Sequence, residues 1–171
     1  IAARKGEIAA VIMEPVRNTQ PLPGFLQAVR GLAEEAGAVF IFDEISSGFR
    51  MNCGGAHLVY GVEPDIAVFS KALGNGYPIA AVIGRAAVME SAQKSFISST
   101  MWTERIGPVA ALATIKKFKA VKAHEHLMKI GHKVQDGWEA VSKRHGLSIK
   151  ISGIYPLSHF IFDDEDQAIM K

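Results

Sequence analysis

Cysteine and long apolar runs are both scarce in this sequence. Cys53 is the single cysteine among 171 residues, so the chain can form neither an internal disulfide framework nor a multi-cysteine metal site. No apolar run approaches the roughly 18 residues that a membrane-spanning helix requires. The first residues, IAARKGEIAA, also lack the basic, apolar and small-residue order of a signal peptide. We therefore expect a cytoplasmic protein without a membrane partner.

The sequence also lacks a large excess of positive or negative charge. The 19 lysines and arginines are nearly balanced by 17 aspartates and glutamates, for a net charge of +2. No basic block stands out, and this absence argues against a nucleic-acid partner. Hydrophobic residues make up 49% of the chain, which is too many for a disordered protein. The composition therefore favours a folded protein that acts on small molecules.

No metal site is predicted either. His124 and His126 are two positions apart in a predicted helix, and this spacing places them on different helix faces. Cys53 lies among glycines with no neighbouring base in the sequence, so nothing predicts an activated thiol. We interpret all three residues as structural or solvated.

The first two thirds of the chain show the pattern of an α/β fold. Nearly continuous apolar runs are typical of strands that are buried on both faces of a parallel sheet. Such runs occupy residues 7–13, 38–42 and 65–70, and residues 79–84 are a fourth strand candidate. Apolar residues recur at helical spacing over 24–36 and end at Gly37, the expected position of a helix C-cap. Further helices are predicted over 86–94 and from about Gly107-Pro108.

The pattern changes after about residue 115. A charged, amphipathic helical region is followed by alternating strand-like stretches, SIKIS and SHFIF. This α+β texture predicts a second domain over 115–171, following a first over 1–114. The chain begins at Ile1 rather than Met and stops at Lys171 within an apparent element. We therefore expect it to be a fragment of a longer protein.

Three of the predicted strands are followed by a charged residue: Glu14, Asp43 and Lys71. Each one alone has a simple explanation, because a chain that leaves a sheet enters water. In open α/β sheets, however, ligands bind beyond the carboxyl ends of the strands. Three such residues in succession therefore predict one shared site.

Lys71 is the most informative of these residues because a glycine-rich loop, FSKALGNGYP, surrounds it. A partly desolvated lysine loses its preference for the charged form, and a neutral amine can form an imine with an aldehyde. The loop does not match a dinucleotide-binding pattern, since Ile79 stands where the third glycine belongs, and no GK[ST] follows. The lysine itself is therefore the better candidate for the functional group.

Three motifs, IMEPV, IFDEISSGFR and FSKALGNGYPIAAVIG, resemble in order and spacing the class III aminotransferases, which are pyridoxal 5'-phosphate (PLP) enzymes of fold type I. Within that family the chain is most similar to the glutamate-1-semialdehyde aminomutase branch. The resemblance covers residues 8 to about 165. It implies the PLP-dependent transferase fold, with residues 1–114 as the second half of the large domain and 115–171 as the start of a small C-terminal domain.

The resemblance also implies roles for individual residues. Lys71 would hold PLP as a Schiff base, Asp43 would pair with the pyridine nitrogen, and Ile45 would pack on the ring. Thr100, in the segment SSTMWTERIGP, would bind the cofactor phosphate of a neighbouring subunit, which implies a homodimer. Glu14 would lie in the substrate pocket or have a structural role. A fixed carboxylate stabilises a protonated pyridine ring, and a released lysine can transfer the substrate proton.

Two features depart from the usual family pattern. Ser46 stands where many members carry a glutamine that contacts the PLP hydroxyl. The segment from Thr100 to Pro108 is longer than usual and adds Trp102, Glu104 and Arg105, which either shape substrate access or form a structural loop. The family's earlier half, with its phosphate loop, is absent from this sequence.

The predicted reaction transfers an amino group between an amino donor and a carbonyl compound. One alternative is an aminomutase, which returns the amino group to a neighbouring carbon of the same molecule. A second alternative is a non-catalytic binding module with this fold, although the presence of Lys71 and Asp43 argues against it.

Overall fold

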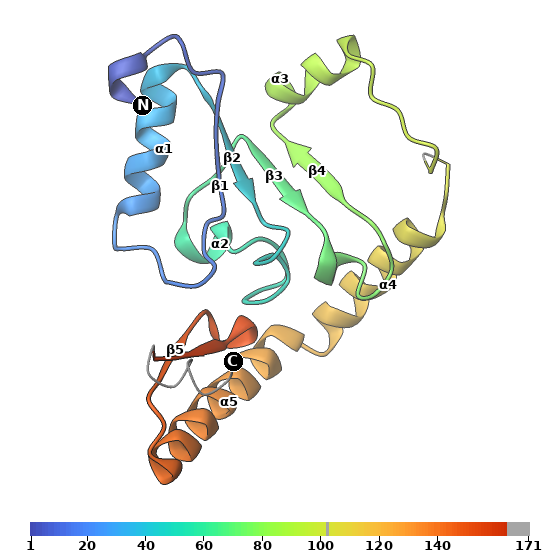
Figure 1. Cartoon of the computed structure of the whole chain (residues 1–171). Helices are drawn as coiled ribbons and strands as arrows, with labels where there is room; N and C mark the ends of the chain where they lie inside the picture. The colour runs from blue at the N-terminus through green and yellow to red at the C-terminus, as the bar shows by residue number, and fades with distance from the viewer. Residues whose placement is uncertain (102, 164–171) are drawn as a thin grey trace.

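A computed structural model describes residues 1–101 and 103–163 of the chain and places a four-stranded sheet at the centre of its first part (Figure 1). The strands are β1 (Ala10–Met13), β2 (Val39–Asp43), β3 (Ile66–Phe69) and β4 (Ala81–Gly84), in the order β1-β2-β3-β4. The first three are parallel, as predicted. β4 runs antiparallel to β3, so the sheet is mixed.

Helix α1 (Phe25–Ala36) connects β1 to β2 and ends as the sequence predicts. Gly37 adopts a left-handed conformation with φ of 71°, and its N–H caps the carbonyls of Ala33 and Glu34. Glycine adopts this conformation without the steric cost of a Cβ. The helix packs Leu26 and Ala33 on the β2 residues Phe40 and Phe42, forming one hydrophobic cluster. This packing covers one face of β2.

The outer strands are more exposed than their apolar sequences predict. Phe40 and Phe42 in β2 are fully buried, whereas Ile12 in β1 is 63% exposed and Ile83 in β4 is 56% exposed. The prediction that the first strand is buried on both faces is therefore wrong for the described residues. β1 and β4 lie at the two edges of this sheet, where no further strand covers them.

Several elements differ in extent from the prediction. The first strand is shorter than 7–13, and a short 3₁₀ turn, η1 (Ala2–Arg4), precedes it. The glycine-rich segment after β2 contains α2 (His57–Tyr60), which the sequence pattern did not predict. The helix expected over 86–94 is divided into α3 (Ala86–Met89) and the 3₁₀ helix η3 (Glu90–Lys94).

The C-terminal part has the α+β character that the sequence predicts. Helix α4 (Ile106–Ala120) is followed by α5 (Ala123–His145), then by β5 (Ile149–Ser152), the 3₁₀ turn η4 (Tyr155–Leu157) and β6 (His159–Phe162). β5 and β6 pair antiparallel. Residue 114 lies inside α4, so the division into domains at that point stays a prediction, and residues 164–171 lie outside the described part. In the described helices, no segment is long and apolar enough to cross a bilayer.

The C-terminal part of the chain packs against the segment that follows β1. The N–H of Gly153 donates to the carbonyl of Asn18 at 2.7 Å. Ile154 is 2% exposed and belongs to a buried cluster with Val16 and Ala56. The C-terminal hairpin is thereby fixed against the loops that follow β1 and β2.

Asp65, just before β3, anchors the opposite end of the sheet. Its carboxylate accepts from the N–H of Phe40 at 2.9 Å and pairs with Arg30 at 3.0 Å and Arg85 at 2.9 Å. Burial by itself raises the pKa of Asp65, but the Phe40 hydrogen bond and the two guanidinium groups outweigh it, so the pKa lies below the ordinary value. The ionised carboxylate is the form that holds β2 and β3 together.

Asp65→Asn should lower the free energy of unfolding by about 2 kcal/mol at pH 7, because hydrogen bonds to a charged group are lost. Since the pKa is lower in the folded state, this contribution is present above the ordinary aspartate pKa and disappears as the pH falls through the lowered value. Urea unfolding at neutral and acid pH measures both effects. Glu7→Gln, which removes an exposed carboxylate paired with Arg4, is the control and should cost less than about 1 kcal/mol. Equal losses in the two variants would contradict this prediction.

Candidate functional site

The three charged residues that follow the strands lie at one edge of the sheet. Met13 pairs with Phe42, and Asp43 pairs with Val68, so Glu14 and Asp43 leave neighbouring strands at nearly the same level. Lys71 comes two residues after the end of β3, in the 3₁₀ turn η2 (Lys71–Leu73). The parallel arrangement of β1, β2 and β3 thus places all three at the carboxyl edge.

Lys71 has an unusual backbone conformation and a defined side-chain contact. Its φ is 46°, in the left-handed region, which costs a non-glycine residue about 1 to 3 kcal/mol. Its Nζ donates a hydrogen bond to the Oγ of Ser46 at 2.7 Å. Such strain is typical of functional sites, and here it accompanies an exposed amine at the carboxyl edge.

Asp43 uses one carboxylate oxygen to shape the next turn. Its Oδ1 accepts from the N–H of Ile45 at 2.9 Å. Among the described residues, no group donates to Oδ2. The turn therefore holds the side chain in a fixed orientation and leaves one oxygen for a ligand.

Glu44 supports this turn from inside the protein, a role that the sequence reading missed. It is 0% exposed and accepts from the Ser47 hydroxyl at 2.6 Å and from the N–H groups of Ala56 and His57, both at 2.8 Å. His57 Nδ1 lies 2.9 Å from Oε1. Burial raises the pKa of Glu44, but the bonds from His57, Ser47 and Ala56 outweigh it, so the pKa lies below the ordinary value.

Glu14 is half-buried, and only one of its two carboxylate oxygens has a partner among the described residues. Its Oε1 pairs with Arg17 at 2.9 Å. Its Oε2 is buried and has no hydrogen-bond partner among the described residues. A buried carboxylate oxygen without a donor is costly, and this one is therefore suited to accept from a ligand or from another part of the protein.

The segment that contains Thr100 lies apart from the other predicted site residues. Residues 95–101 are exposed and follow η3 along the outer side of the molecule beyond β4 (Figure 1). The structure therefore does not bring Thr100 to Lys71 within one chain. Glu104 in the predicted insert caps α4, accepting from Ile106 at 2.6 Å and Gly107 at 3.2 Å, which favours a structural loop. Trp102 lies outside the described residues.

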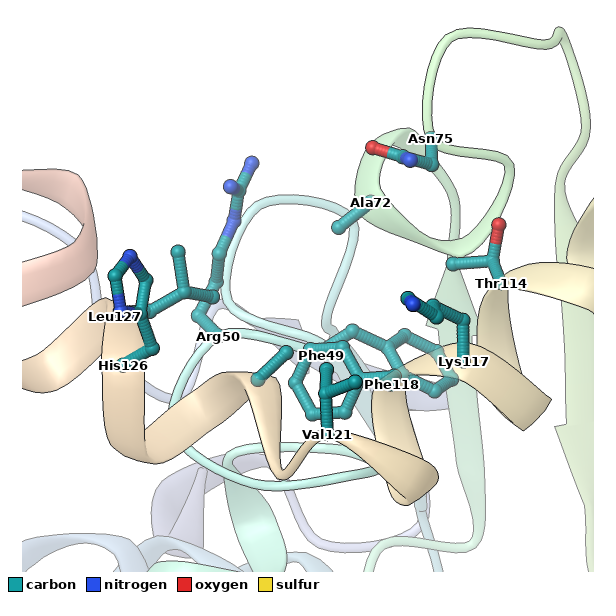
Figure 2. Close-up of a pocket in the computed structure, with 11 residues that line it drawn as sticks. Phe49, Arg50, Ala72, Asn75, Thr114, Lys117, Phe118, Val121, His126 and Leu127 are labelled. Atoms are coloured by element: carbon teal, nitrogen blue, oxygen red, sulfur yellow. The ribbon is translucent and has the colours of Figure 1, made fainter.

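A hollow of about 270 Å³ opens beside the Lys71 turn. Figure 2 shows Arg50 and Asn75 at its rim, with the rings of Phe49 and Phe118 below them. Burial lowers the pKa of Arg50, whose Nε donates to the Ser46 carbonyl at 3.4 Å. Lys71, Asp43 and Glu14 do not line this hollow. It lies beside the carboxyl edge and is separate from it.

Comparison with known proteins shows the family of this chain. The pattern of the family "Aminotransferase class-III" matches residues 1–154. The 3-aminobutyryl-CoA aminotransferase of Cloacimonas acidaminovorans is 34% identical, over 100% of this chain and 43% of that protein. The glutamate-1-semialdehyde 2,1-aminomutase of Roseiflexus castenholzii is 33% identical, over 96% of this chain and 40% of that protein.

A solved structure supports the same assignment. The PLP internal aldimine form of the Sphingopyxis FumI protein matches with a TM-score of 0.89 and 30% identity, over 95% of this chain and 41% of that one. The chain therefore belongs to the class-III aminotransferase family, and the predicted resemblance and fold class are confirmed. It spans between 40% and 43% of the length of these relatives.

Gly55 provides a test of the Glu44 network, because an added Cβ would clash with His57 Nδ1 and lie 2.7 Å from Glu44 Oε1. Gly55→Ala should therefore lower the free energy of unfolding by about 1 to 3 kcal/mol, as overpacking does. Gly137 in α5 has no atom within 4 Å of its added Cβ, so Gly137→Ala should raise it by about 1 kcal/mol through helix propensity. Chemical denaturation measures both, and a neutral Gly55→Ala would contradict the packing described here.

Proposed function

We propose that the whole protein is a PLP-dependent aminotransferase that moves an amino group from an amino donor to a carbonyl substrate in the cytoplasm. The observation that carries this proposal is the arrangement at the carboxyl edge. A fixed aspartate with one open oxygen ends β2, and an exposed lysine amine lies in the turn after the adjacent strand β3. The relatives that match the chain include aminotransferases.

The residues at this edge fit the cofactor. Lys71 supplies a primary amine for the PLP aldehyde, and the open Oδ2 of Asp43 supplies a negative charge for the ring nitrogen. Ile45 follows Asp43 in the same turn, where an apolar side chain can pack on the ring. When bound, PLP supplies the electron sink for carbanion chemistry.

Lys71 and Glu14 have separate roles in the proposed reaction. The free amine of Lys71 would take and return the substrate α-proton as general base and acid. Glu14, with its unpartnered Oε2, accepts a hydrogen bond from a substrate donor group.

The apolar surface next to the Thr100 segment supports the proposal of a homodimer. Helix α4 exposes Ile106, Val109 and Leu112 at 60%, 62% and 69%, and Tyr77 nearby is 56% exposed. Tyr77, Ile106 and Val109 line a shallow hollow of about 370 Å³. An exposed apolar patch of this kind is typical of an interaction surface. We propose that a second copy covers it and that Thr100 then reaches the cofactor phosphate of that copy.

An aminomutase is a second candidate function. The aminomutase of Roseiflexus castenholzii is 33% identical, almost the same as the 34% of the first aminotransferase. Both reactions use the same lysine and aspartate. They differ in where the amino group ends: on a second molecule in an aminotransferase, and on a neighbouring carbon of the same molecule in an aminomutase. Product analysis with a labelled amino group therefore separates them.

Borohydride reduction of the whole protein with PLP should place the pyridoxyl group on the peptide that contains Lys71. Lys71→Ala should abolish this label and lower the rate of amino transfer by at least about 10² to 10⁴, the contribution of a proton-transfer group. Peptide mapping by mass spectrometry gives the site. A pyridoxyl group on another lysine would overturn the assignment.

Heterodimers test the role of Thr100. Thr100→Ala should weaken PLP binding about ten- to a hundredfold, because a hydrogen bond to a charged group contributes about 1.5 to 3 kcal/mol. In a heterodimer of Lys71→Ala and Thr100→Ala subunits, one site carries both defects and the other carries neither. Activity per heterodimer should therefore rise towards half that of the wild type. No recovery in verified heterodimers would contradict a contact across the interface.

A further inference from the structure

We propose that Ser46 is a positioning residue for Lys71, holding the lysine amine whenever that amine is not bonded to the cofactor. This inference rests on the proposed function and concerns the same site. The observation that supports it is the 2.7 Å hydrogen bond from Lys71 Nζ to Ser46 Oγ.

The backbone around Ser46 is held from both sides. On one side, the N–H of Ile45 is bonded to Asp43, and Glu44 is buried in its own network. On the other side, Arg50 donates to the Ser46 carbonyl at 3.4 Å. The Ser46 hydroxyl is therefore an acceptor with a fixed position. The loop that carries it is already ordered before the lysine amine binds to it.

Lys71 by contrast has a flexible side chain on a strained backbone. Its φ of 46° is set by the 3₁₀ turn, in which the Lys71 carbonyl accepts from the N–H groups of Gly74 and Asn75. The turn fixes the position of the Lys71 backbone, and the hydrogen bond to Ser46 fixes the position of the amine at the end of the side chain. Holding the amine in one place reduces the rotamer freedom that is otherwise lost on each return to the cofactor.

The chemistry of the hydroxyl suits this role. A serine hydroxyl accepts through its lone pairs while keeping one hydrogen to donate. Among the described residues, no carboxylate pairs with Lys71, so Ser46 is the group that orients the amine without binding it as an ion pair. A neutral acceptor releases the lysine more readily than a carboxylate does.

The first test uses the whole protein after removal of the cofactor. The labelling rate of Lys71 by acetic anhydride, read by mass spectrometry, should rise about tenfold in Ser46→Ala, because an amine released from its hydrogen bond is more accessible. Ser46→Thr retains the hydroxyl and should restore the wild-type rate. Ser91→Ala is the matched control, since Ser91 is an exposed serine in the 3₁₀ helix η3, outside the carboxyl edge. An unchanged rate in Ser46→Ala, or an equal rise in Ser91→Ala, would overturn the inference.

The second test follows the loaded protein. In Ser46→Ala, the single-turnover rate of amino transfer should fall about tenfold, and the isotope effect of an α-deuterated donor should increase as proton transfer becomes slower. Ser91→Ala should leave that isotope effect at its wild-type value. An isotope effect that is the same in Ser46→Ala and wild type would contradict the role. A wild-type protein that takes no pyridoxyl label on Lys71 would refute the proposed function, whereas the cofactor-free labelling would still test the contact.

Discussion

The carboxylate of Glu44, buried at the end of β2, is the constraint on which the site depends. A charge at 0% exposure is tolerated only when donors surround it, and here they come from Ser47, Ala56 and His57. These donors span the loop from the end of β2 to the start of α2, so the loop must close around the carboxylate. Closing it leaves Asp43 and Ser46 facing the turn after β3. A buried residue with no role in the chemistry thus sets the positions of those that have one.

The two halves of the carboxyl edge are stabilised in different ways. The loop after β2 is held by a satisfied buried charge, which keeps it rigid. The turn after β3 is short and strained, with positive φ at both Lys71 and Asn75. Strain of this kind persists only where the surroundings require it, and the hydrogen bond between Lys71 and Ser46 connects the strained turn to the rigid loop. The rigid loop after β2 thereby stabilises the strained turn after β3.

Much of this arrangement could be predicted from the sequence, for physical reasons. The apolar runs over 38–42 and 65–70 and Gly37 after the 24–36 helix predicted the central strands and the helix end. The direction of β4 could not be read, because an apolar run is the same in either direction. Glu44 was overlooked because a charged residue after a strand is normally solvated. Its burial depends on backbone donors at Ala56 and His57, whose position in space no local pattern records. The roles proposed for Lys71, Asp43, Ile45, Thr100 and Glu14 remain predictions.

The exposed edges of the sheet determine how this chain behaves away from the rest of its protein. β1 and β4 each pair on one side only in the described part, and they present Ile12, Val82 and Ile83 at 63%, 53% and 56% exposure. Unpaired backbone groups next to apolar side chains form a template on which another strand can add. Expressed by itself, the chain would therefore recruit its own copies edge to edge and precipitate at high concentration. A lysine on the exposed side of β4 would suppress this edge-to-edge association. β4 is therefore the strand to change first in order to keep the isolated chain in solution.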